Sequence, residues 1–169
     1  LSYITISTLG NNADFGDLSV TRANCTSCSD VTRGLFAGGQ NSDVIDYITI
    51  ATTGNSTDFG DLTVGRYSAM AASDTTRGVF AGGLQGQNYN TIDYVTIQTT
   101  GNATDFGDLT LTRGHNDGGG SSNAIRAVFA GGYNKTNVID YVTIQTTGNA
   151  TDFGDLLGGV QKVAAAAGT

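Results

Sequence analysis

An internal repeat runs through almost the whole chain. The pentapeptide Asp-Phe-Gly-Asp-Leu begins at residues 14, 58, 105 and 152, so successive copies lie 44, 47 and 47 residues apart. The residues from Ile92 to Leu109 recur letter for letter from Ile139 to Leu156. A fixed period of about 45 residues is typical of solenoids and propellers, in which each unit packs only on its neighbours.

Each repeat is rich in residues that favour strands and turns. The 169 residues include 25 Gly and no Pro or Trp, and every acidic residue is Asp. One unit, Arg66 to Thr112, divides at its turn residues into four extended segments. The predicted strands are Tyr67–Ser73, Arg77–Gly83, Ile92–Gln98 and Phe106–Leu111, with a variable polar loop at Leu84–Asn90. We therefore predict an all-β propeller, or part of one, with blades of four antiparallel strands.

The recurring sequence motifs divide residues 1–169 into about 3.5 repeats within a single repeat domain. Residues 1–21 hold the third and fourth strands of a partial blade, residues 22–65, 66–112 and 113–156 hold three blades, and residues 157–169 hold the first strand of a further blade, at Val163–Ala167. Such an array leaves unpaired strand edges at both ends, and exposed edges tend to recruit a partner. We expect the chain to be part of a larger ring, or to complete one with copies of itself or with another chain.

Each repeat runs in the same order: an arginine, small residues, an apolar strand that ends in Gly-Gly, a loop, a strand that carries tyrosine, and an aromatic residue before the next arginine. This order resembles the kelch type of β-propeller repeat. Gly82-Gly83 match its double glycine and Tyr94 its following tyrosine, whereas Phe106 stands where kelch repeats usually carry Trp. The wording GNATDFGDLT with RGVFAGG is similar to kelch-like repeats of cyanophage tail-fibre and other virion structural proteins. This resemblance implies a non-enzymatic structural or receptor-facing component of a phage virion, with other virion proteins as partners. The alternative is a secreted or cell-surface bacterial propeller that binds carbohydrate or mediates adhesion.

Recognition is expected in the loops that differ between blades, because irregular loops on a rigid scaffold usually carry binding. These loops are residues 40–44, 84–91 and 133–138, and the segment Gly114–Asn123 replaces a small apolar first strand with a flexible, glycine-rich variant. A host surface glycan is the expected ligand. The candidate ligand contacts are Tyr89, Asn90, Tyr133, Asn134, His115 and Asp117.

Catalytic chemistry is not expected. His115 is the only histidine, and no Gly-x-Ser-x-Gly elbow accompanies Asp117 and Ser121. Cys25 and Cys28 spell Cys-x-x-Cys, but residues three apart on a strand point to opposite faces. We interpret both cysteines as small core residues rather than as a metal or redox pair.

Pairs of aspartates recur at the fourth strand, and Ca²⁺ is the cation whose ligand preference they meet. The candidates are Asp58, Asp61, Asp105 and Asp108. Asx turns, in which an Asp side chain accepts from nearby backbone N–H groups, explain the same residues without a metal. We favour the turns and expect no other cofactor.

A second set of aspartates lies inside the third strand, where an unpaired carboxylate is disfavoured. These are Asp46, Asp93 and Asp140, and an arginine opens each neighbouring second strand, namely Arg33, Arg77 and Arg126. We predict that these aspartates pair with these arginines as structural contacts.

Charge and hydropathy exclude two classes of partner. The formal net charge of -7 and the scattered Lys and Arg residues argue against nucleic acid, whose affinity comes largely from clustered cations. The sequence has no run of about eighteen apolar residues, so membrane insertion is not expected.

Overall fold

A computed structural model describes residues 1–40, 42–114, 118–132 and 135–165. These residues form antiparallel strands in four sheets, and they contain no α-helix. The N-terminal hairpin consists of β1 (Ser2–Tyr3) and β2 (Ala13–Asp14). Three larger sheets follow it along the chain, and we call them blades 1, 2 and 3.

Each blade has one inner strand, two middle strands and one outer strand in chain order. Blade 1 is β3 (Thr26–Ser29), β4 (Arg33–Ala37), β5 (Val44–Thr49) and β6 (Thr57–Asp61). Blade 2 is β7 (Met70–Ser73), β8 (Arg77–Ala81), β10 (Gln87–Thr96) and β11 (Thr104–Arg113), with the short β9 (Leu84–Gln85) paired to β10. Blade 3 is β12 (Gly118–Ser122), β13 (Arg126–Gly131), β14 (Val138–Thr143) and β15 (Thr151–Asp155).

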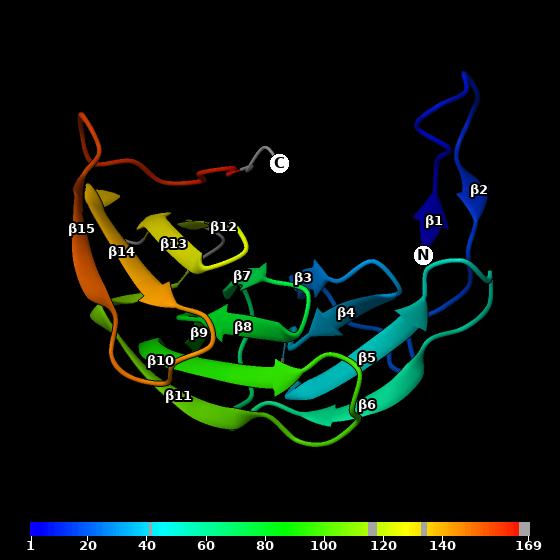
Figure 1. The fold of residues 1–169 in the computed structure, drawn as a ribbon, viewed down its shortest axis with the longest axis horizontal. Coiled ribbons are helices and arrows are strands. Elements are labelled where there is room, and N and C mark those ends of the chain that lie inside the picture. Colours follow the sequence, from blue (N-terminus) through cyan, green and yellow to red (C-terminus); the bar gives the residue numbers. More distant parts are fainter. Residues whose placement is uncertain (41, 115–117, 133–134, 166–169) are drawn as a thin grey trace.

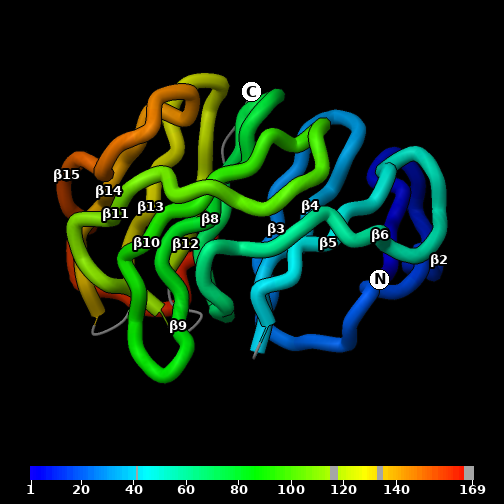
Figure 2. The backbone as a smooth tube through the Cα atoms, turned by 90° about the horizontal axis from the view of Figure 1, so that it is seen from below, coloured from blue at the N-terminus to red at the C-terminus, as the bar shows by residue number. Residues whose placement is uncertain are grey.

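The sheets fan out as an open arc (Figure 1). The inner strand β7 packs against both β3 and β12, and the outer strands lie on the rim. Blade 3 and the N-terminal hairpin occupy opposite ends of the arc in both views (Figures 1 and 2). The prediction of an all-β partial propeller with four-stranded blades is confirmed.

The arc does not close through the C-terminal segment within the described residues, where β1 pairs with β2 alone. Val163 and Ala165 lie beside β12, because a Cβ placed on Gly119 would stand 3.0 Å from Val163 Cγ1 and 3.1 Å from Ala165 Cβ. Residues 163–165 are not in a strand, so the predicted strand Val163–Ala167 is wrong over its described part; residues 166 and 167 lie outside it. A strand needs a hydrogen-bonded neighbour, and no described segment pairs with these residues.

The core lies between blades rather than within one of them, because each blade packs through its faces on its neighbours. One cluster joins blades 1 and 2: Leu35, Ala37, Ile45, Phe59, Leu62, Phe80, Val95 and Ile97. The other joins blades 2 and 3: Met70, Ala72, Val79, Ala81, Ile92, Phe106, Leu109, Ala127, Phe129, Val142 and Ile144. Repeated residues thus meet repeated surroundings, which is why the same letters serve in each blade.

Two segments expected to be irregular are strands. The predicted loop Leu84–Asn90 is a hairpin of β9 and the start of β10, which turns at Gly86 with a φ of +71°. In the predicted flexible segment, residues 118–122 form β12 and pair with β13. Glycine lets this inner strand approach its neighbour, since a Cβ on Gly120 would lie 2.5 Å from Ala71 O.

Candidate functional site

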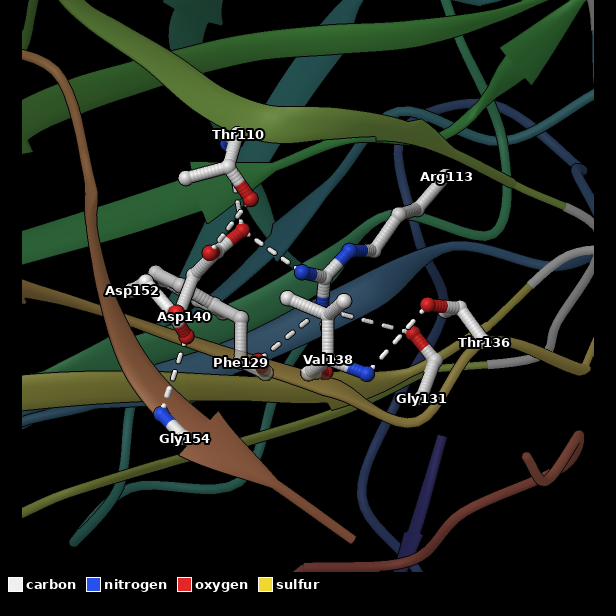
Figure 3. A network of polar contacts seen from close by, with 9 residues as sticks. All are labelled: Thr110, Arg113, Phe129, Gly131, Thr136, Val138, Asp140, Asp152 and Gly154. Carbon is white, nitrogen blue, oxygen red and sulfur yellow. Dashed lines mark hydrogen bonds and ion pairs between the residues drawn. The ribbon is translucent and has the colours of Figure 1, made fainter. Parts of the chain in front are cut away.

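A buried polar network joins each blade to the chain segment that enters it. In blade 3, Arg113 Nη2 lies 2.6 Å from Asp140 Oδ2, and Thr110 Oγ1 donates to Asp140 Oδ1 at 2.6 Å (Figure 3). Arg113 Nη1 also donates to Phe129 O at 2.9 Å. Both charged side chains are buried, so the ion pair has no competing water.

The same network recurs in the other two blades. Arg66 Nη1 lies 2.9 Å from Asp93 Oδ2, and Arg22 Nη1 lies 2.8 Å from Asp46 Oδ2. The hydroxyl donors to these carboxylates are Thr63 and Ser19. In blades 1 and 2 the arginine and the hydroxyl come from the segment that follows the preceding outer strand, and in blade 3 they come from the C-terminal half of β11. The network therefore joins one blade to the next.

The predicted arginine partners are therefore wrong: the aspartates pair with Arg22, Arg66 and Arg113, not with Arg33, Arg77 and Arg126. Side-chain alternation is the reason. Arg77 pairs across from Thr96 and Val79 from Tyr94, so Arg77 shares the face of Tyr94, while Asp93 points to the opposite face.

Arg33, Arg77 and Arg126 instead cover the repeated tyrosines. Each guanidinium carbon lies 4.5 Å from the ring centroid of Tyr47, Tyr94 or Tyr141. Arg33 Nη1 then donates to Ile97 O, and Arg77 Nη1 donates to Ile144 O, in the following blade. These arginines thus bridge blades through a carbonyl rather than through a carboxylate.

Burial governs the ionisation of the arginine in the blade 3 network. Desolvation lowers the pKa of Arg113, and the neighbouring Asp140 carboxylate acts in the opposite direction. The guanidinium, which blade 2 supplies, is held by the Asp140 carboxylate and by the Phe129 carbonyl of blade 3. This arrangement suits a structural ion pair, in which hydrogen bonds offset the loss of water.

A shallow polar pocket recurs in all three blades, beside the turn between the third and fourth strands. Its volume is about 280 Å³ in blades 1 and 2 and about 260 Å³ in blade 3. Each copy takes a tyrosine, four threonines, a glycine and an asparagine from the same repeat positions; in blade 2 these include Tyr94, Thr99 and Asn102. Hydroxyl, amide and aromatic groups without a charge suit a neutral ligand rich in hydroxyl groups.

The repeated turn beside each pocket is visible in the sequence. Residues 99–102 and 146–149 are exposed, or nearly so, yet they are identical in the two repeats. The hydrogen bonds that Gly101 and Asn102 make to blade 1 account for the identity of those two positions. The identical exposed threonines, Thr99 with Thr146 and Thr100 with Thr147, are the sequence feature that locates the pockets.

The predicted ligand residues are placed only in part. Tyr89 and Asn90 lie in β10, where Tyr89 N donates to Gly83 O at 2.9 Å and both side chains are half-buried. They line none of the three repeated pockets. His115, Asp117, Tyr133 and Asn134 lie outside the described residues.

Asp105, one of the four aspartates considered for Ca²⁺, accepts a hydrogen bond from the backbone. Asp105 Oδ1 accepts from Gly107 N at 3.2 Å, as an Asx turn requires. Desolvation, then the nearby Asp43 and Asp58 carboxylates, raise the pKa of Asp61. No group of three His, Cys, Asp or Glu side chains that could hold a metal occurs among residues 1–40, 42–114, 118–132 and 135–165.

The two cysteines are both free thiols and do not converge on a site. Cys25 precedes β3 and Cys28 lies within it, where a Cβ on Gly78 of blade 2 would stand 2.7 Å from its Sγ. Burial, with a smaller contribution from Asp30, raises the pKa of the Cys28 thiol to about 12. A thiol so protonated is a poor nucleophile and a poor metal ligand at neutral pH.

An aspartate at the turn between the inner and second strands links blades 2 and 3. Asp74 Oδ1 accepts from Thr76 N and Arg77 N, both at 2.7 Å, and Gln145 Nε2 donates to Asp74 Oδ2 at 2.6 Å. Burial opposes ionisation of Asp74, but the hydrogen bonds from Arg77, Gln145 and Thr76 and the Arg77 charge outweigh it. The pKa of Asp74 is therefore lower than its usual value.

The substitution Asp74→Asn is expected to make stability less sensitive to acid. A depressed folded-state pKa stabilises the fold above the unfolded pKa, and this stabilisation disappears as the pH falls through the folded value. The turn should survive, because Asn123 occupies this position in blade 3 and accepts from Ile125 N and Arg126 N at 2.8 and 2.7 Å. Urea unfolding from about pH 5 to pH 2 should show a smaller loss of stability than in the wild type. Equal losses would contradict the prediction.

Comparison with known proteins leaves the chain without an assigned family. No protein-family model matches it, and no curated protein matches it. The described residues include no helix long and apolar enough to cross a membrane.

Proposed function

We propose that the chain is a non-enzymatic recognition module, a kelch-like partial propeller that binds a neutral glycan through the repeated pockets. The observation that carries the proposal is the pocket in blades 1, 2 and 3, built from the same residue types at the same repeat positions. Each pocket is small and open, so a single contact is weak. Three contacts on one rigid scaffold multiply through effective concentration.

The place of action that fits best is the surface of a phage virion, in a tail fibre or a decoration. The repeat wording around Asn102 and Phe106 supports this part of the proposal through its resemblance to cyanophage virion proteins. Genes for baseplate or capsid proteins beside this gene would favour the virion. A secretion signal encoded upstream would favour the alternative, a secreted carbohydrate-binding propeller.

The pockets can be tested by removing one exposed hydroxyl from each. The triple variant Thr52→Val, Thr99→Val and Thr146→Val keeps side-chain shape, and each position lines a pocket. We expect binding to a printed array of purified bacterial surface polysaccharides to fall by about tenfold or more, because each lost hydrogen bond acts in every pocket at once.

The matched control is a triple variant at exposed threonines outside the pockets. Thr21→Val, Thr75→Val and Thr112→Val make the same chemical change. Their binding should equal that of the wild type. Equal binding by all three proteins, or no binding by the wild type, would contradict the glycan proposal.

A further inference from the structure

One end of the arc exposes a face that the repeat buries in the other blades. Phe153 on β15 is 56% exposed, whereas Phe59 and Phe106, at the same repeat position, are each 3% exposed. Phe59 and Phe106 are covered by the blade that follows them along the chain. We call the surface around Phe153, with Tyr141 and Leu156, the blade 3 end face.

The other end exposes the complementary half of the same contact. Ile4 and Ile6 on the N-terminal hairpin are 63% and 94% exposed. Their repeat equivalents in blade 2, Val95 and Ile97, are 4% and 0% exposed because blade 1 covers them. We call the surface of Ile4, Ile6 and the turn at residues 10–12 the hairpin end face.

Every junction inside the arc uses one hydrogen-bond pattern. Between blades 1 and 2, Gly101 N donates to Phe59 O at 2.7 Å and Ala103 N donates to Asp61 O at 2.7 Å. In return, Asp61 N donates to Asn102 Oδ1 at 3.1 Å. The pattern recurs between the hairpin and blade 1 through Gly54, Asn55 and Ser56, and between blades 2 and 3 through Gly148, Asn149 and Ala150.

The two end faces hold the unused halves of this pattern. Gly10, Asn11 and Asn12 occupy the turn positions of Gly101, Asn102 and Ala103, and all three are exposed. A Cβ on Gly107 would lie 2.5 Å from Gly148 O of the next blade, but a Cβ on Gly154, the equivalent residue, would meet nothing within 4 Å. The position that the next turn occupies elsewhere is open at Gly154.

We propose that the hairpin end face of a second copy of this chain docks on the blade 3 end face, head to tail. In this contact Gly10 N of the second copy donates to Phe153 O, and Asn12 N donates to Asp155 O. Asp155 N donates to Asn11 Oδ1, and Ile6 packs against the Tyr141 ring. The contact is a fourth junction of the kind that the arc already contains three times.

The buried charges favour a second copy over an ordinary repeat as the occupant. Val160 O accepts from Gly132 N at 3.2 Å, as Arg113 O accepts from Gly83 N, so Val160 stands in the arginine position. Ser2 pairs with Asp14 as Asp46 pairs with Asp58, so Ser2 stands in the aspartate position. An ordinary repeat would bring an aspartate to Val160 and bury it without a cation. A second copy brings Ser2, and no unpaired charge is buried.

A head-to-tail contact and a two-fold contact can be distinguished with variants that each block one end face. Ile6→Asp blocks only the hairpin end face, and Phe153→Asp blocks only the blade 3 end face. We expect wild-type chain to associate with rising concentration in sedimentation velocity, and each variant to associate at least about tenfold more weakly. An equimolar mixture of the two variants should form a dimer and nothing larger, because one intact face of each kind remains.

Two further measurements separate the contact from folding and from general charge. Val31→Asp adds the same charge at an exposed turn away from both end faces and should associate like the wild type. Asn11→Ala should weaken association about fivefold without changing thermal stability, whereas Asn102→Ala, at the internal junction, should lower stability without changing association. Because each copy carries a net charge of -7, added salt should strengthen the association.

Three results would each overturn the proposal: a wild-type chain that stays monomeric at all concentrations, Ile6→Asp or Phe153→Asp variants that associate as well as the wild type, or a mixture of these variants that stays monomeric. Monomeric wild-type chain would mean that something other than a second copy covers the end faces. Glycan binding is tested by substitutions at Thr52, Thr99 and Thr146, which belong to neither end face, so its failure leaves this result unchanged.

Discussion

Asp93→Ala is expected to lower the free energy of unfolding by about 3–5 kcal/mol. The Asp93 carboxylate is fully buried, it pairs with Arg66 at 2.9 Å, and it accepts from the Thr63 hydroxyl. Its removal leaves a buried guanidinium without a counter-charge. Urea unfolding followed by far-UV circular dichroism measures the change.

Two controls identify the cause of that loss. Asp43→Ala removes an exposed carboxylate and should change stability by less than about 0.5 kcal/mol. The double variant Arg66→Met and Asp93→Leu removes both charges and should be more stable than Asp93→Ala, because no unpaired charge remains. A double variant less stable than Asp93→Ala would show that the network acts through shape rather than through charge.

The sheet architecture could be predicted because its signals are local. The period, the alternation of side chains and the turn residues lie within one repeat, and strands found at Arg77–Ala81 and Thr104–Arg113 overlap the predicted segments. The hairpin of β9 and the start of β10 is not predicted, because the segment is polar and its reversal depends on a single turn glycine, Gly86. The polar composition of this segment does not indicate whether it forms strands, whereas the positive φ of Gly86 lets the chain reverse there.

The partners of the buried aspartates required information that spans two blades. Two arginines per repeat compete for one aspartate, and Arg77 is nearer to Asp93 in sequence than Arg66 is. The side-chain parity of the paired strands excludes Arg77, and the path of the chain between blades brings Arg66 to the other face. The first of these facts follows from strand register. The second, the position of Arg66, requires the arrangement of neighbouring blades, which the sequence of one repeat does not contain.

The aspartate networks and the residues of the two end faces bear on which blades can be neighbours. Inside the arc, a misplaced blade would bury an arginine or an aspartate alone, so the networks fix both register and neighbour. At the ends, Ser2 and Val160 replace the charged pair with neutral residues. In the proposed head-to-tail contact, the two end faces therefore suit each other better than either suits an internal blade.

Phe106→Ala is expected to cost about 3–5 kcal/mol of stability, while Phe153→Ala should cost less than about 1 kcal/mol. The residues from Ile92 to Leu109 and from Ile139 to Leu156 are identical, so local propensity and sequence context cancel in the comparison. The two phenylalanines differ in what covers them: blade 3 buries Phe106, and Phe153 lies on the blade 3 end face. Both variants should be unfolded in urea at a concentration low enough to keep the chain monomeric. If the two substitutions cost the same, the stability of a blade would arise within its own sheet, and burial between neighbouring blades could not be what holds the arc together.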